Sequence, residues 1–242
     1  MLTKSKAIVI KSLKYSDKKL IVELLTEEHG RISSAINISE RKGGKFRKQM
    51  FQPLTLLTIE TDYRQNVSLQ RITDARIEHP CISISCDAIK ASIGMFLAEV
   101  LHYVAKQEAE DRILFSFVEN SILYLDAAER GVANFHIAFL VRLIQILGFL
   151  PDAKKCDTGN IFDLHTAEFT YSTPSHRNFL KDERAQAMRL ILRMTYNNMH
   201  LFQMTREQRR ECLNNILLFY RIHLPSFPEP KSVAVLQEVF GR

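Results

Sequence analysis

The chain has 242 residues, of which 46% are hydrophobic and 25% are charged, a composition typical of soluble proteins with one large core or two modest ones. No run approaches the roughly 18 apolar residues that a membrane-spanning helix needs, and the N-terminal residues lack the pattern of a signal peptide. We therefore expect a cytoplasmic protein with no membrane partner.

The positive charge is concentrated at one end of the chain. The formal net charge is +6, and the first fifty residues contain twelve Lys and Arg against five Asp and Glu. The remainder is close to neutral. This asymmetry favours a nucleic acid or another anionic surface as the partner.

The first eighty residues predict an all-β domain. Short β-prone runs alternate with turn residues, and residues 11–17 are interpreted as the end of the first strand and a turn. The expected strands cover residues 7–10, 20–26, 31–38, 54–61 and 67–77. Five short strands with meander connections predict a small closed barrel of the oligonucleotide-binding (OB-fold) kind, over residues 1–80.

Beyond Pro80 the apolar residues recur at helical spacing, after a possible N-cap at Ser85 or Asp87. We expect helices near residues 89–104, 113–125, 135–147, 188–194, 213–220 and 233–240. The third of these ends where Gly148 and Pro151 stop it. The fold class is therefore predicted to be α+β, with an all-α domain over residues 81–242.

A polar excursion interrupts the helices over residues 154–179, within which 162–164 and 168–172 have the pattern of a small hairpin. The four cysteines, at 81, 86, 156 and 212, include no C-x-x-C pair. Such spacing favours free thiols in a reducing compartment over a structural zinc, so we expect no metal and no cofactor. Cys156 with His165 or His176 is left as the alternative metal site.

A basic octet lies between the third and fourth expected strands, and its sequence is Arg41-Lys42-Gly43-Gly44-Lys45-Phe46-Arg47-Lys48. Five cations and two glycines cannot form core, so the octet is predicted to be a surface loop. Clustered cations bind polyanions, and an aromatic ring stacks on bases. A solvated loop that only keeps the domain soluble is the alternative.

Motifs of catalysis are not found in the sequence. It contains no G-x-S-x-G, no P-loop, no H-E-x-x-H and no G-x-G-x-x-G. Asp111 and Glu119 fall on amphipathic helices, where a solvated face explains them. We therefore expect a protein that is not an enzyme and has no catalytic residues.

Several short motifs in order resemble the bacterial DNA repair and recombination mediator family RecO, and its Bacteroidetes members in particular. The motifs are Ala7–Lys11 with Tyr15-Ser16-Asp17 and Leu20-Ile21-Val22, Leu25–Arg31, Phe51–Leu54, Leu147–Pro151 and Lys231–Phe240. The resemblance covers nearly the whole chain.

This resemblance implies a function in strand annealing and an association with the nucleoid. A RecO-like protein would bind single- and double-stranded DNA, engage the acidic C-terminal tail of single-stranded DNA-binding protein, and act with RecR to load RecA. Many relatives carry a zinc ribbon made of two C-x-x-C pairs after the Leu-Gly-Phe-x-Pro segment. Here Gly159 stands where the partner of Cys156 would be, so we expect the zinc to be lost and the excursion to be held by packing of Phe162, Leu164, Phe169 and Tyr171.

Two groups of site residues are predicted. The candidates for phosphate contacts, with Phe46 as a stacking ring, are Lys11, Lys14, Arg31, Arg41, Lys42, Lys45, Phe46, Arg47 and Lys48. Tyr63 is a further stacking candidate. An apolar groove edged by cations would take the partner's acidic tail, and two alternative edges are predicted. One consists of Arg130, Arg142, Lys154 and Lys155, which flank the third expected helix, and the other consists of Arg189 and Arg193, four apart on the fourth. Ordinary charges on helix faces are the alternative interpretation.

Two competing functions are weighed against DNA annealing. In the first, the barrel is a protein-interaction adaptor and its charge is incidental. In the second, the chain is an RNA-binding or hydrolytic enzyme, which the missing motifs disfavour.

Overall fold

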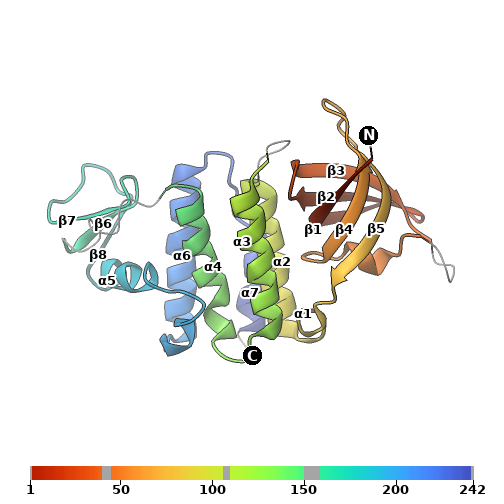
Figure 1. Cartoon of the computed structure of the whole chain (residues 1–242). Coiled ribbons are helices and arrows are strands. Elements are labelled where there is room, and N and C mark those ends of the chain that lie inside the picture. The colour runs from red at the N-terminus through yellow and green to blue at the C-terminus, as the bar shows by residue number, and fades with distance from the viewer. Residues whose placement is uncertain (1, 40–44, 106–109, 150–158, 241–242) are drawn as a thin grey trace. The chain divides into compact units, whose positions relative to one another are not determined.

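The computed structural model describes residues 2–39, 45–105, 110–149 and 159–240 (Figure 1). Its described residues form an α+β fold in which an antiparallel sheet is followed by helices and a smaller sheet. The strands of the first sheet are β1 Leu2–Ser16, β2 Lys19–Thr26, β3 Gly30–Asn37, β4 Leu56–Asp62 and β5 Arg71–His79. The helices are α1 Ile82–Cys86, α2 Ala88–Val104, α3 Arg112–Ala127, α4 Phe135–Ile146, α5 Asp182–Ile191, α6 Arg206–His223 and α7 Ser232–Val239.

The N-terminal sheet has the strand order β3-β2-β1-β4-β5 among the described residues, with antiparallel neighbours. Its two edges meet at a parallel bridge between Ser34 and Gln70, where the Gln70 amide donates to the Ser33 carbonyl at 2.7 Å. Alternate side chains of the strands therefore face a common interior, in which Val22 and Ile59 are fully buried. Phe51, from the short helix Lys48–Phe51, is buried in the same core.

Strand β1 is longer than the sequence predicts. Residues 11–16 were interpreted as a strand end and a turn, yet Lys11 pairs with Glu23 and Ser16 pairs with Lys19. The prediction was wrong because these residues are polar and mostly exposed, so the burial that produces an alternating pattern is missing. Cross-strand pairing with β2 extends the strand into a hairpin.

The described helices agree with the predicted segments, with one addition and one helix that begins and ends earlier than expected. The Asp87 side chain accepts hydrogen bonds from the amides of Ile89 and Lys90, which confirms it as the N-cap of α2. The five-residue α1 was not predicted. The helix expected over residues 188–194 begins earlier, at Asp182, and ends at Ile191.

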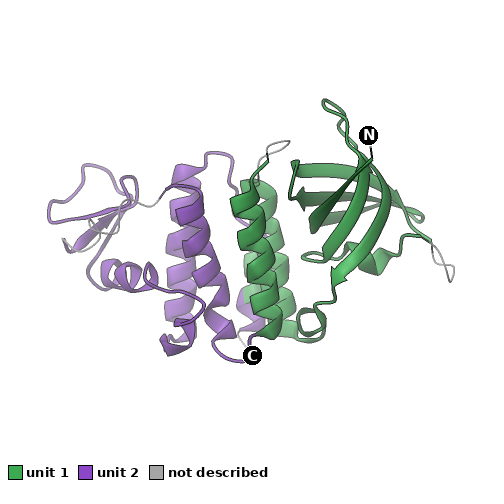
Figure 2. Cartoon of the chain, viewed as in Figure 1, with its two compact units in different colours: residues 1–127, 232–236 green, residues 128–231, 237–242 purple. Residues whose placement is uncertain are grey.

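Contacts divide the chain into two compact units (Figure 2). Unit 1 comprises residues 1–127 with 232–236, and unit 2 comprises residues 128–231 with 237–242. In unit 1 the helices belong with the sheet, since the Lys6 ammonium on β1 lies 2.8 Å from the Glu119 carboxylate on α3. That ion pair raises the pKa of Lys6. The predicted division at residue 80 therefore does not coincide with the contact units and stays a prediction.

The excursion in unit 2 contains a small sheet of order β7-β6-β8, with β6 Ile161–Asp163, β7 Glu168–Thr170 and β8 Phe179–Lys181. The hairpin of β6 and β7 is confirmed, and β8 was not predicted. A Cβ at Gly159 would lie 2.4 Å from the Thr170 nitrogen, so this backbone excludes a cysteine at the position.

Packing of the small sheet follows the prediction with one exception. The rings of Phe162 and Phe169 lie 4.8 Å apart between centroids, and Leu164 is fully buried. Tyr171 was expected to join them but is 77% exposed, because it follows the end of β7. Cys156 lies outside the described residues. His165 bonds to Asn178 at 3.0 Å and His176 lies 3.3 Å from Asp163, so both histidines brace the excursion.

The free energy of unfolding is expected to depend on pH through His136, which is buried on α4. Burial, with a smaller contribution from the charge of Arg209, lowers its pKa from 6.5 to about 3. Between these values the unfolded chain binds a proton that the folded chain does not, so unfolding takes up a proton and the free energy of unfolding decreases as the pH is lowered. The contribution of His136 to the free energy of unfolding is fully present above pH 6.5. About 2 kcal/mol of it is lost when the pH is lowered to 5.

Urea unfolding of wild-type protein and His136→Met at pH 7.5 and 5 measures this contribution. We expect the loss of stability between the two pH values to be smaller in the variant by about 2 kcal/mol. An equal loss in both proteins would show that His136 is not the group responsible.

Candidate nucleic-acid interface

The β1–β2 hairpin and the base of the basic octet are joined by backbone hydrogen bonds. The Ile38 amide, just after β3, donates to the Lys18 carbonyl at 2.9 Å. The Ser39 amide donates to the Phe46 carbonyl, also at 2.9 Å, which closes the described base of the octet. The end of the hairpin and the described base of the octet therefore lie next to each other at one end of the sheet.

The octet's described cations remain at the surface. Arg47 and Lys48 are exposed, and Lys48 begins the short helix that ends at Phe51. The Lys45 ammonium is exposed and lies 3.6 Å from the carboxylate of Asp74. Arg41 and Lys42 lie outside the described residues.

Both stacking candidates named from the sequence face protein. Phe46 packs partly buried against the barrel core and meets Phe51 edge to face, with centroids 6.1 Å apart. Tyr63 also packs against this core and stacks on the ring of His29 at 3.9 Å. Neither ring is therefore presented to a base in this conformation.

Arg31 belongs to a polar cluster between the sheet and α2. Its guanidinium donates to the backbone carbonyl of His102 and lies 3.8 Å from the Glu23 carboxylate. The His102 ring lies 2.7 Å from the same carboxylate and 3.3 Å from the Lys11 ammonium. The Arg31 side chain is only 16% exposed, so its charge is already compensated within the protein.

The sequence reasoning named Lys14 at the end of the β1–β2 hairpin but missed its neighbours Tyr15, Lys18 and Lys19. Tyr15 is 74% exposed, and the Lys19 ammonium lies 6.0 Å from the centroid of its ring. Lys18 is exposed, as is Lys14, whose ammonium pairs with Asp17 at 2.6 Å and lowers the pKa of that carboxyl. An aromatic residue among three lysines indicates a possible nucleic-acid contact in the sequence, but the same residues are equally typical of a solvent-exposed turn.

We call the surface formed by these hairpin and octet residues the cationic tip. Its members are Lys14, Tyr15, Lys18, Lys19, Arg47 and Lys48. Five positively charged side chains and one exposed aromatic ring are the groups needed to bind a strand with a charged backbone and flat bases.

The structure describes four of the six candidates for binding a partner's acidic tail. Arg130 and Arg142 are exposed, and Arg142 donates to Gln145 at 2.7 Å. The Arg189 guanidinium covers the Phe169 ring at 4.2 Å and bonds to the Gly159 carbonyl. Arg193 lies beyond the end of α5, so the two arginines do not share that helix as expected. Lys154 and Lys155 lie outside the described residues.

The described residues place a five-stranded antiparallel sheet, with joined edges and exposed cations, before a set of helices, and this order defines a protein of the α+β class. None of the helices formed by the described residues has the length and apolar character needed to cross a bilayer. Comparison with known proteins narrows the class.

The family models described as Recombination protein O N terminal and Recombination protein O C terminal match residues 1–81 and 86–232. A DNA repair protein RecO of Bacteroides fragilis is 42% identical over 99% of this chain and all of its own length. Those of Phocaeicola vulgatus and Christiangramia forsetii are 40% and 31% identical, each over the full length of both chains. The chain belongs to the RecO family of DNA repair and recombination proteins.

Proposed function

We propose that the protein binds DNA through the cationic tip and anneals complementary strands during recombinational repair. Membership of the RecO family over the whole chain carries this proposal. Annealing breaks no covalent bond, so it requires only that two phosphate backbones be neutralised while the bases stay accessible. The proposed role is therefore that of a binding protein with no catalytic residues.

The N-terminal sheet is proposed to be an OB-fold. The order β3-β2-β1-β4-β5 and the parallel bridge between the strand edges support this assignment, since both suit a small Greek-key barrel. In such barrels the connecting loops are common binding sites for oligonucleotides. The β1–β2 hairpin is one of these loops.

The proposed partners come from the family resemblance. They are RecR, the acidic tail of single-stranded DNA-binding protein and, indirectly, RecA, with the cytoplasm as the compartment. In unit 2 the exposed arginines Arg130, Arg142 and Arg193 are the candidates for contact with such a tail, whereas the Arg189 guanidinium covers the Phe169 ring of the small sheet. A fluorescent acidic peptide with a free C-terminus, titrated against alanine variants of the three, tests the assignment.

Titration of labelled single-stranded oligonucleotide at about 50 and 200 mM salt separates the annealing protein from an adaptor. An annealing protein binds at low salt and weakens steeply as salt rises, because binding releases counterions. Negligible affinity at 50 mM salt would favour the adaptor, whose barrel binds protein. A strand-annealing assay on the same samples then tests the activity itself.

Tyr15 is expected to stack on a base. Tyr15→Ala should weaken binding of single-stranded DNA by about 1–3 kcal/mol, the range for loss of one stacked base, while Tyr15→Phe should bind like the wild type. The salt dependence should stay unchanged in both, because no cation is removed. Fluorescence anisotropy measures the affinities, and equal weakening by alanine and phenylalanine would contradict stacking.

A further inference from the structure

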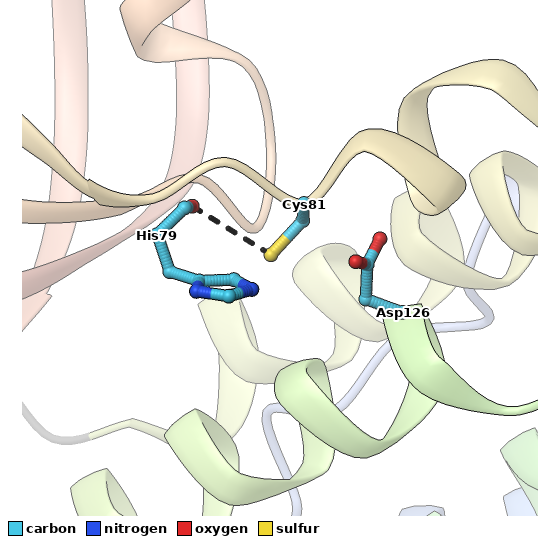
Figure 3. Close-up of side chains that lie close together, drawn as sticks. All are labelled: His79, Cys81 and Asp126. Carbon is cyan, nitrogen blue, oxygen red and sulfur yellow. Dashed lines mark hydrogen bonds between the residues drawn. The ribbon is translucent and has the colours of Figure 1, made fainter.

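Three potential metal ligands converge within unit 1, away from the cationic tip. They are His79 at the end of β5, Cys81 two residues later and Asp126 near the end of α3. Among the described residues, their ligand atoms all lie within 4.8 Å of one another. Figure 3 shows the sulfur of Cys81 on the side of the imidazole, with the carboxylate of Asp126 facing it.

The backbone around the three residues is fixed. His79 pairs with Leu56 in the β4–β5 ladder. The Lys90 ammonium, which is buried, donates to the backbone carbonyl of Asp126 at 2.8 Å and holds the end of α3. The three side chains are thus brought together by a strand end and a helix end that do not depend on a metal.

The carboxylate of Asp126 is also oriented. One of its oxygens accepts the Ile84 amide at 2.9 Å, which leaves the second oxygen able to bind a metal ion. Hydrogen bonds of this kind position the ligands of known metal sites and raise metal affinity.

We propose that His79, Cys81 and Asp126 bind a zinc ion, with water as the fourth ligand. Imidazole nitrogen, thiolate sulfur and carboxylate oxygen are the donors that zinc takes in proteins, and the thiolate disfavours magnesium and calcium. Bond lengths of about 2.0–2.3 Å place tetrahedral ligands about 3.5 Å apart. The ligand atoms must therefore move roughly an ångström closer to one another to bind the ion. Rotation about the side-chain bonds allows this movement.

The site has access to solvent. His79 is exposed, Cys81 and Asp126 are half-buried, and both His79 and Cys81 line a cavity of about 640 Å³. The cavity also borders Ile77 of β5 and Gly94 of α2, so it lies between the sheet and α2. An ion bound here would connect β5 to α3 and stabilise the attachment of the sheet to the helices of unit 1. This role is independent of the proposed DNA binding.

The test uses the full-length protein after removal of metal with a chelator. Titration with zinc chloride by calorimetry should show one equivalent bound, and cobalt chloride should give the absorption of a thiolate-bound tetrahedral ion. Bound zinc should also raise the melting temperature, since it binds the folded state. Cys81→Ser should lower zinc affinity by at least about 100-fold, and His79→Ala should lower it by at least about tenfold.

Two cysteine variants provide matched controls. Cys86→Ser removes an exposed free thiol five residues away, and Cys156→Ser removes the cysteine of the excursion. Both should bind zinc like the wild type. Failure of the wild type to bind zinc at micromolar concentration, unchanged binding by Cys81→Ser, or loss of binding in Cys156→Ser would each overturn the proposal.

Discussion

A variant with alanine at four cations of the cationic tip is expected to lose most of its affinity for single-stranded DNA and its annealing activity. The four substituted residues are Lys14, Lys18, Arg47 and Lys48. Each cation that neutralises a phosphate of a single strand contributes about 0.7 to the slope of log affinity against log salt. The slope should therefore become shallower by about 3, and the affinity at low salt should fall at least roughly tenfold. Anisotropy titrations at several salt concentrations measure both.

The control for this variant removes the same charge elsewhere. Alanine replaces four exposed arginines of the helices and the excursion, which are Arg112, Arg177, Arg210 and Arg221. Net charge then falls equally in both variants, so a difference between them reports the place of the charge. If both variants bind DNA equally weakly, DNA binding depends on the total charge of the protein and the cationic tip is not the interface.

Arg31→Ala is expected to destabilise the protein and to leave the salt slope unchanged. The guanidinium shares the Glu23 carboxylate with His102, and the side chains of all three are less than 20% exposed. Its removal leaves a largely buried carboxylate with a poorer set of partners and the His102 carbonyl without this donor. We expect a loss of about 2–3 kcal/mol, less than the 3–5 kcal/mol of fully buried pairs because some solvent remains.

Urea unfolding gives the change in stability, and oligonucleotide binding at several salt concentrations gives the slope. Arg71→Ala is the matched control, since Arg71 is an exposed arginine in the same sheet and should cost no more than about 0.5 kcal/mol. A contrary result would be an Arg31→Ala variant that is as stable as the wild type but binds DNA with a shallower salt dependence. Arg31 would then be a DNA contact, and its cluster with His102 would not stabilise the fold.

The spacing of apolar residues predicts a strand or helix correctly where buried positions recur at a fixed interval along the chain. Period-two burial located β2 and β3, and helical spacing located α2, α3 and α4 within a few residues. No such interval is present where burial is irregular or where the strand or helix is short, and these elements differ from the prediction. The polar half of β1, the single turns of α1 and the three residues of β8 have too few buried positions to form a period.

The sequence predicts the charge of the candidate interface but not which of its cations are exposed. The excess of lysine and arginine near the N-terminus and the motifs of the RecO family can be read directly from the residues. Residue types alone gave no means of separating Arg31 from Arg47. One is enclosed by Glu23 and His102, and the other is exposed.

The sequence by itself determined the α+β order of elements, the concentration of positive charge and the family. The tertiary structure decided which cations face solvent, that Phe46 and Tyr63 pack inward while Tyr15 stays exposed, and that His79 and Cys81 meet Asp126. Short-range order follows from neighbours within a few residues. A charge or a ligand acquires its role from partners far along the chain, which only the pairing of strands and the packing of helices bring within reach.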